Sequence, residues 1–125
     1  LRQRKGSRMD NRRKIGMAYE ERAAEHLRDL GYRILERNFR CRLGEIDLIA
    51  EEAGVLVFLE VKYRKSSQFG NPAEAVTPAK QKTICRVADF YRMSRGISES
   101  CNCRFDVAAI LGEKVQVYKD AFPYR

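Results

Sequence analysis

The sequence predicts an α/β domain in which helices flank a central mixed β-sheet. Two segments carry apolar residues at a helical period, and five shorter apolar segments are typical of strands. Their order along the chain is α-β-β-β-α-β-β, which favours helices packed on one sheet. With 125 residues, 44% of them hydrophobic, the chain is long enough to close a core. We expect one domain over residues 15–125.

Residues 14–35 predict the first, amphipathic helix. Its apolar stripe comprises Ala23, Ala24, Leu27 and Leu30. Gly31 is a typical C-terminal stop. Glu20 has the helical spacing of the apolar stripe, so its side chain is expected to point inward. An alternative is that Glu20 lies at the margin of the stripe, in a first turn where an acid favours the helix dipole.

Three strands are expected next. The segment YRILERNF at 32–39 predicts a short strand, and EIDLIA at 45–50 and VLVFLEVKY at 55–63 predict two stronger ones. Between the latter two, EEAG is a short connection with the glycine that hairpins favour. The polar segment 64–76, with Gly70 and Pro72, predicts a mobile loop.

A second helix and a strand pair complete the prediction. Thr77 and Pro78 suit a helix cap and first turn, and the helix should stop near Gly96. Its inward residues are expected to be Ile84, Val87, Ala88 and Tyr91. The segments at 104–111 and 114–118 form the closing strand pair around Gly112.

Charge and cysteine content limit the classes of function. The net charge is +8, but residues 1–14 hold seven basic side chains and one aspartate, so we expect a basic, disordered arm and a nearly balanced body. No apolar run is long enough to span a bilayer, and the amino terminus lacks the apolar segment of a secretory signal. A cytoplasmic protein without a membrane partner is expected. The four cysteines lack zinc-site spacing and are expected to be reduced thiols.

Charged residues interrupt the two strongest strands. Because side chains alternate across a strand, Glu45 and Asp47 share one face, and Glu60 and Lys62 share one face of the next strand. The intervening residues are uniformly apolar and are expected to take the core: Ile46, Leu48, Val57, Leu59 and Val61.

Hairpin register decides whether the charged faces coincide. A four-residue turn would set Ala50 opposite Val55, which places Glu45 opposite Glu60 and Asp47 opposite Phe58. A slip of two residues keeps the charged groups on one side, whereas a shift of one separates them. The apolar alternation favours the register that brings them together.

Such a cluster of acids requires a positive partner. Like charges on one sheet face are destabilising, and carboxylates in a partly dry site cost several kcal/mol unless compensated. Lys62 and a divalent cation are the candidates, and the oxygen ligands suit Mg²⁺ or Mn²⁺: Glu45, Asp47, Glu60 and, from the helix, Glu20. With an adjacent lysine, such a metal is equipped for phosphodiester hydrolysis. The alternative is that these are solvent-facing charges that protect an edge strand from aggregation.

The order of these motifs resembles a known family. Asp47 followed by Glu60-Val61-Lys62 resembles the Asp, Glu-x-Lys signature of the restriction-endonuclease-like nucleases. Four blocks are similar to the YraN-like family of bacterial proteins, predicted endonucleases related to archaeal Holliday-junction resolvases: GYRILERNFRCRLGEIDLIA, LVFLEVKYR, FGNPAEAVTPAKQ and RFDVAAI. The resemblance spans roughly residues 11–122 and implies a restriction-endonuclease-like fold.

The resemblance also implies roles for individual residues. Asp47 and Glu60 match the magnesium ligands and Lys62 the catalytic lysine, while Glu20 matches the acid on the first helix that approaches the metal in related resolvases. Glu45 matches the GEID block, either as a group supporting the ligands or as a strand-edge charge. The family usually has glycine before the helical acid, where this chain has Tyr19, a side chain that would narrow the approach to the site.

These inferences predict a metal-dependent endonuclease acting on DNA, with branched or structured DNA as its substrate. Phosphate contacts are expected from the basic arm and from Arg64, Lys65, Lys80, Lys82 and Arg86, although for each one taken singly a solvated surface charge is the more common interpretation. A homodimer is an open alternative to a monomer. The rival functions are a non-catalytic nucleic-acid-binding module with the same fold and a protein-interaction subunit without affinity for nucleic acid.

Overall fold

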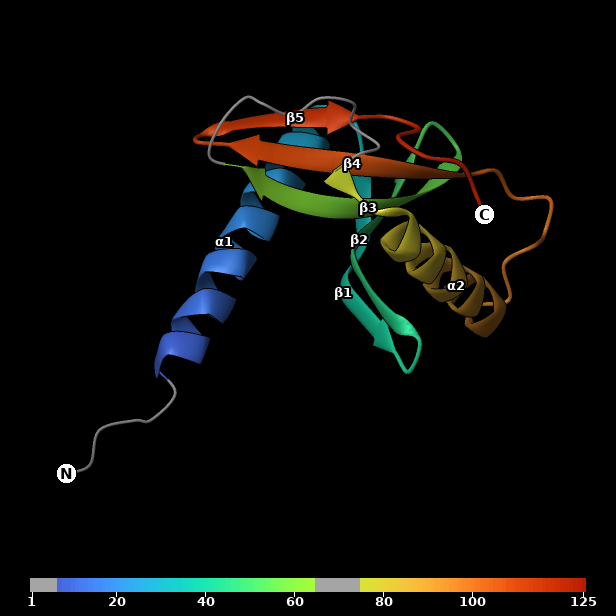
Figure 1. Cartoon of the computed structure of the whole chain (residues 1–125). Helices are drawn as coiled ribbons and strands as arrows, with labels where there is room; N and C mark the ends of the chain where they lie inside the picture. The colour runs from blue at the N-terminus through green and yellow to red at the C-terminus, as the bar shows by residue number, and fades with distance from the viewer. Residues whose placement is uncertain (1–6, 65–74) are drawn as a thin grey trace.

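The structure, a computed structural model, describes residues 7–64 and 75–125. It confirms the predicted order of elements and the α/β class (Figure 1). The elements are α1 (Ser7–Asp29), β1 (Arg33–Cys41), β2 (Gly44–Glu52), β3 (Val55–Arg64), α2 (Pro78–Ser94), β4 (Cys103–Leu111) and β5 (Lys114–Tyr118).

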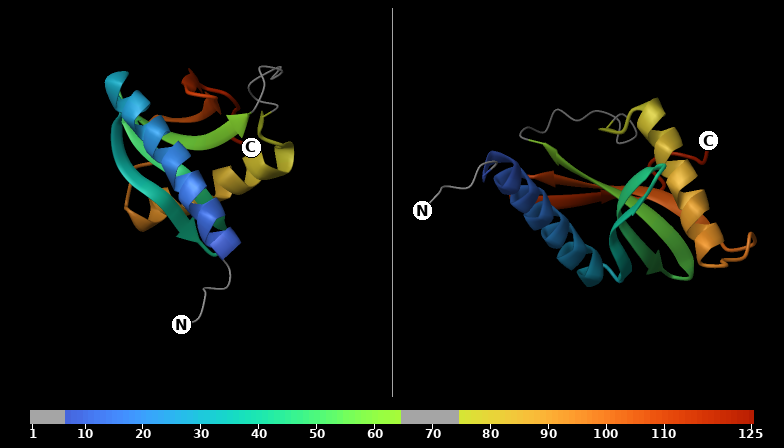
Figure 2. Two further views of the ribbon diagram at one scale, coloured as in Figure 1. Left: turned by 90° about the vertical axis from the view of Figure 1, so that its left-hand side faces the viewer. Right: turned by 90° about the horizontal axis from the view of Figure 1, so that it is seen from below.

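The five strands form one mixed sheet in the order β1-β2-β3-β4-β5. Neighbouring strands are antiparallel except β3 and β4, which are parallel and are joined through α2. A parallel pair needs such a crossover because the chain must return to the end of the sheet at which the first strand begins. The β1–β2 hairpin runs between α1 and α2, so that the helices lie on either side of it (Figures 1 and 2).

Apolar residues fill both faces of the sheet. The face towards α1 buries Ala23, Leu27, Leu48, Ala50, Val57, Leu59, Ala108 and Ile110. The face towards α2 buries Ile46, Ile49, Leu56, Phe58, Phe105 and Val107 beneath the predicted helix residues Ile84, Val87, Ala88 and Tyr91. The expectation of one core face was therefore incomplete. Ile46 was also misplaced, because it lies beyond the last β2–β3 pair and packs with the α2 side.

The β2–β3 turn is tighter than predicted. Ala53 and Gly54 both have positive φ, as two-residue hairpin turns require, and Glu52 pairs with Val55. The predicted pairing of Ala50 with Val55 was therefore wrong by two residues, a slip that keeps the faces unchanged. Glu52 can remain in the ladder because its carboxylate accepts hydrogen bonds from Arg104 at 2.9 Å and Lys119 at 2.7 Å.

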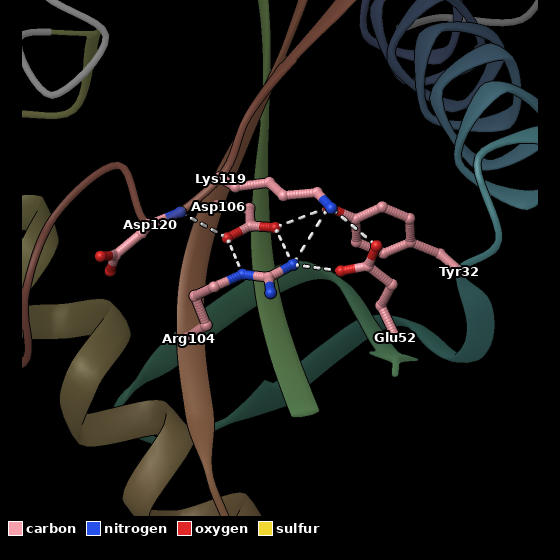
Figure 3. Close-up of polar contacts among 6 residues, drawn as sticks. All are labelled: Tyr32, Glu52, Arg104, Asp106, Lys119 and Asp120. Atoms are coloured by element: carbon pink, nitrogen blue, oxygen red, sulfur yellow. Dashed lines mark hydrogen bonds and ion pairs between the residues drawn. The ribbon is translucent and has the colours of Figure 1, made fainter. Parts of the chain in front are cut away.

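Glu52 belongs to a polar network centred on the fully buried Asp106 (Figure 3). Asp106 Oδ2 accepts from the Tyr32 hydroxyl at 2.8 Å, and Oδ1 accepts from Arg104 Nε and from the backbone N–H of Asp120, both at 2.9 Å. Burial and the Asp106 carboxylate raise the pKa of Tyr32. Each hydrogen bond pairs a donor of one residue in the network with an acceptor of another. The network therefore connects the segment after α1, the β2–β3 hairpin and the segment after β5.

Helix α1 begins earlier than predicted. It begins at Ser7, so residues 7–14, expected in a disordered arm, form helix; residues 1–6 lie outside the described residues. It ends before Gly31, whose φ of 102° closes the helix as expected, and this leaves Leu30 half exposed rather than in the stripe. No helix in the described ranges is both long and apolar enough to cross a membrane.

The predicted mobile loop lies mostly at 65–74, outside the described residues. Its last two residues, Ala75 and Val76, are buried against α2 instead of remaining mobile. Thr77 caps α2 and Pro78 occupies its first turn, as predicted.

Candidate active site

The two halves of the sheet separate within the predicted acidic region. Strands β2 and β3 pair from Glu52–Val55 to Leu48–Leu59 and no further, although both strands continue. Beyond that point β2 pairs only with β1, and β3 only with β4. Asp47 and Glu60 are the first residues past the last pair. The separation of the strands therefore places one carboxylate on each side of a gap in the sheet.

Asp47 fills part of this gap with its own side chain. Its Oδ2 accepts the backbone N–H of Val61 at 2.8 Å, in place of the ladder bond that β2 no longer provides. Burial raises the pKa of Asp47, the Val61 hydrogen bond opposes this shift, and the charge of Glu45 adds to it. Asp47 is thus held in one orientation by the β3 backbone while its second oxygen is left for another partner.

Glu60 is buried beside Asp47, with 7% of its surface exposed. Burial raises the pKa of Glu60 to about 7, and the charge of Asp47 contributes to the shift. A hydrogen bond with the Asp47 carboxyl adds to the same shift. Two adjacent buried carboxyls with raised pKa values favour a positively charged partner.

Two lysines approach Glu60 from different elements. Lys62 Nζ lies 3.6 Å from Glu60 Oε2, and Lys80 Nζ lies 3.9 Å from the same oxygen. Lys62 comes from β3, two residues along the same face, as predicted. Lys80 comes from the first turn of α2, where Thr77 Oγ1 accepts its backbone N–H at 3.2 Å. Lys80 had been expected only as a surface phosphate contact, and its approach to Glu60 depends on the crossover of α2.

Close packing of α2 against β2 brings Lys80 to the site. A Cβ atom on Gly44 would lie 2.7 Å from Thr83 Cγ2 and 3.2 Å from Val87 Cγ2. Gly44 also has a φ of 149°. Only glycine allows the helix this close to the start of β2.

Glu20 reaches the carboxylates from α1. Glu20 is half-buried, burial raises its pKa, and the charge of Asp47 contributes to the shift. A hydrogen bond with Asn38 opposes the shift. Asn38 has a φ of 52° within β1, a conformation that asparagine tolerates better than most residues. Sequence reasoning did not find Asn38, although an asparagine in a strand is an unusual choice.

Glu45 lies at the outer side of this group. Its carboxylate is 3.6 Å from Arg40 Nε on the paired strand, and its charge raises the pKa of Asp47 and of Glu20.

A cavity of about 660 Å³ opens here between α1 and the β1–β2 hairpin. Its lining residues are Arg12, Arg13, Gly16, Met17, Glu20, Asn38, Arg40 and Glu45. Arg12 and Arg13 thus belong to a pocket wall and not, as expected, to a disordered arm.

The chain matches a family model over the region that contains these acids and lysines. Residues 19–110 match the model described as Uncharacterised protein family UPF0102. The chain belongs to UPF0102. This is the YraN-like family that its motifs resemble.

Curated UPF0102 proteins are similar over most of their length. The UPF0102 protein of Lachnoclostridium phytofermentans is 47% identical over 112 residues, which cover 90% of this chain and 95% of the relative. The Caldicellulosiruptor saccharolyticus protein is 48% identical over 80% of this chain and 84% of its own length. The protein of Symbiobacterium thermophilum is 53% identical over 78% of this chain and 82% of its own length.

The structure describes three of the other basic residues predicted in this UPF0102 chain: Arg64, Lys82 and Arg86. Lys82 is exposed on α2, and Lys65 lies outside the described residues. Arg86 donates to the Tyr124 hydroxyl and to the Arg125 carbonyl, both at 2.9 Å, and so ties the C-terminal segment to α2. Arg64 is half-buried and donates to the carbonyl of Tyr63 at 3.3 Å.

The carboxylates of this site can be compared with the ligands that Mg²⁺ prefers. Among the described residues, no group of three or more Asp, Glu, His or Cys side chains is arranged to hold a metal. Asp47 and Glu60 lie next to each other at the gap between β2 and β3. Mg²⁺ is commonly held by one or two carboxylates, with waters and phosphate oxygens completing its shell, so this pair suffices as the protein contribution.

Proposed function

We propose that this UPF0102 chain is a metal-dependent endonuclease that hydrolyses phosphodiester bonds in DNA, with Asp47 and Glu60 as ligands of Mg²⁺ or Mn²⁺. The observation that carries the proposal is the pair of buried carboxyls at the gap between β2 and β3, next to two lysine ammonium groups. Burying two like charges beside each other is costly and serves no packing purpose. A site for a hard cation explains the arrangement.

Each nearby residue has a role in such a reaction. A bound Mg²⁺ would polarise the phosphate and lower the pKa of a coordinated water. Lys62 and Lys80 supply positive charge where the phosphate gains negative charge in the transition state. Burial and the charge of Asp47 raise the pKa of Glu20, which would make it a better proton acceptor. Asp47 and Glu60 hold the cation, and the Val61 N–H fixes the orientation of Asp47.

The cavity beside Glu20 supports a polyanionic substrate. Arg12, Arg13 and Arg40 line it together with Glu20 and Glu45. Arginines in such a place contact phosphates and orient a nucleic-acid strand without reading its sequence. Binding through these groups would weaken as salt concentration rises, because each neutralised phosphate releases condensed counterions.

A cleavage assay tests the proposal. The purified chain is incubated with single-stranded, duplex, flap and four-way-junction DNA, in Mg²⁺, in Mn²⁺ and in chelator. Glu60→Gln and Lys62→Ala are compared with Glu113→Gln, a control in the exposed β4–β5 turn. We expect metal-dependent products from the unaltered chain and from Glu113→Gln, and roughly a hundredfold less or none from the two site variants.

Measuring DNA binding as well as cleavage on the same substrates distinguishes the rival functions. If the chain and Glu60→Gln bind DNA equally but neither cuts it under any condition, the chain is a binding module and the nuclease proposal fails. If neither shows salt-dependent DNA binding, a protein-interaction role replaces both.

A further inference from the structure

Tyr19 of α1 and Tyr63 of β3 form a stacked pair near the carboxylates. Their ring centroids are 4.4 Å apart and the rings are inclined by 13°. Tyr19 precedes Glu20, and Tyr63 follows Lys62. Tyr63 lies in the part of β3 that β2 has left, so no strand covers this edge on the β2 side within the described residues. The residue expected to narrow the approach to the site is therefore one half of an aromatic surface beside it.

The pair differs from the other stacked rings in the described structure. Phe58–Phe105 and Phe105–Phe122 are also stacked, but each ring belongs to a residue no more than 5% exposed, as core packing requires. Tyr63 instead has 37% of its surface exposed. Tyr19 packs against the apolar cluster under α1 and supports the inner side of the pair. Core packing explains the burial of Tyr19 but not a stacked, solvent-facing tyrosine on β3.

A cation lies beside this surface. Arg22, one turn further along α1 from Tyr19, donates to the carbonyl of Gly112 at 2.8 Å, which holds its guanidinium at this end of the sheet. Lys62 lies on the opposite face of β3 from Tyr63, because side chains alternate along a strand. The end of β3 thus presents an ammonium group beside the carboxylates on one face and an aromatic ring on the other.

An exposed aromatic ring beside a cation has one common ligand in nucleic-acid proteins. Nucleobases stack on such rings irrespective of sequence, while nearby cations contact the backbone. Bases in a continuous duplex are stacked on each other and cannot reach the ring unless they are extruded. The ring therefore favours nucleotides that are already unpaired.

We infer that the Tyr19–Tyr63 pair binds an unpaired nucleobase of the DNA strand that is cut. The substrate class is accordingly DNA with single-stranded nucleotides at the cleavage point, such as a flap, gap or junction, and not continuous duplex. This inference rests on the proposed nuclease function for the position of the cut, whereas base binding itself can be measured without cleavage.

The test measures binding in chelator with the full chain carrying Glu60→Gln, so that no cleavage occurs. The chain contains no tryptophan, so Tyr63→Trp introduces a single fluorophore at the surface. We expect its emission to be quenched by single-stranded and flap DNA and to change little with blunt duplex. In chains with no other substitution, Tyr63→Leu should weaken the binding of flap DNA about tenfold or more, whereas Tyr63→Phe should not. The affinity for duplex DNA should be the same in the unaltered chain and in these two variants.

Tyr124→Leu is the matched control, since Tyr124 is 57% exposed and contacts Arg86 and Asp89 on α2 rather than β3. Its flap affinity should equal that of the unaltered chain. Unchanged flap binding in Tyr63→Leu, or equal losses for flap and duplex, would overturn the inference. If Tyr63→Leu fails to unfold cooperatively, the quenching of Tyr63→Trp decides: equal quenching by flap and duplex, or none, rejects the site.

The two proposals fail separately. A chain that cuts DNA but whose Tyr63 variants bind and cut flap and duplex as before is a nuclease without the base site. A chain that shows selective quenching but no metal-dependent cleavage binds unpaired bases and is not a nuclease.

Discussion

Asp47 accepts the backbone N–H of Val61 at 2.8 Å, where β2 parts from β3. A side chain thus completes the hydrogen bonding that the sheet leaves open, and the same carboxyl faces Glu60. Asp47 therefore has a structural role, as acceptor for Val61, and a candidate chemical role beside Glu60. Different substitutions of Asp47 can separate these two roles.

Asp47→Asn should retain the fold and lose the function. The amide oxygen still accepts the Val61 N–H, and the removal of a buried charge should leave the free energy of unfolding equal or higher. Asp47→Leu leaves that N–H without its acceptor, which costs about 1–3 kcal/mol. Urea unfolding compares the three chains. If Asp47→Asn were as unstable as Asp47→Leu, the Val61 bond would not be the structural role of this residue. Both variants should bind Mn²⁺ at least about tenfold more weakly.

Stability of the metal-free chain should depend on pH through Glu60. Burial raises its pKa from the ordinary 4.5 to about 7, so between these values the folded chain binds more protons than the unfolded chain. The free energy of unfolding should therefore fall as pH rises through this window, by at most about 1.4 kcal/mol per pH unit. Glu60→Gln should flatten the slope and Glu113→Gln should keep it. Urea unfolding at several pH values measures this. A slope of opposite sign would contradict the raised pKa.

Mg²⁺ should counteract this loss of stability. A cation binds the ionised carboxylates, so its stabilising effect should be greater above neutral pH than below it, and chelator should remove it. Thermal unfolding with and without Mg²⁺ at about pH 5.5 and about pH 8 tests this expectation. Equal Mg²⁺ shifts in the unaltered chain and in Glu60→Gln would show that the ion binds elsewhere.

Lys80 should be needed for turnover and Lys82 should not. Lys80 Nζ lies 3.9 Å from Glu60 Oε2, whereas Lys82 is exposed two residues further along α2. Lys80→Ala should slow single-turnover cleavage about tenfold or more, because charge facing the phosphate is lost. It should not weaken metal binding, since the ammonium and the metal compete for one carboxylate. Lys80→Arg should recover part of the rate. Equal losses in Lys80→Ala and Lys82→Ala would point to general phosphate attraction instead.

Gly44→Ala should destabilise the chain by about 1–3 kcal/mol, because its Cβ would clash with Thr83 and Val87 and its φ is unfavourable for alanine. Gly16→Ala is the contrasting variant: Gly16 lies in α1 with nothing within 4 Å of an added Cβ, so stability should rise by about 0.5–1 kcal/mol. Chemical denaturation of both variants measures the difference. A neutral Gly44→Ala would show that α2 can move away from β2 at little cost.

Local rules predicted most of the elements. Thr77-Pro78 marked the start of α2, Gly31 the end of α1, and the apolar alternation one core face of the β2–β3 hairpin. Errors arose where residues far apart in sequence decide the outcome. Glu51 and Glu52 were assigned to a turn because acids favour loops, yet Arg33 and Arg104 pair with them and extend the strands. The helical start at Ser7 was missed because a dense basic charge is typical of solvated arms.

The sequence by itself determined the identity and alternation of the site residues. Period-two spacing puts Glu60 and Lys62 on one face, and helical spacing turns Glu20 inward, since both depend only on backbone geometry. Only the tertiary structure decided what those faces meet. The end of β2–β3 pairing, the crossover that delivers Lys80 and the stacking of Tyr19 on Tyr63 are contacts between distant segments. They depend on packing of whole elements, which no local pattern encodes.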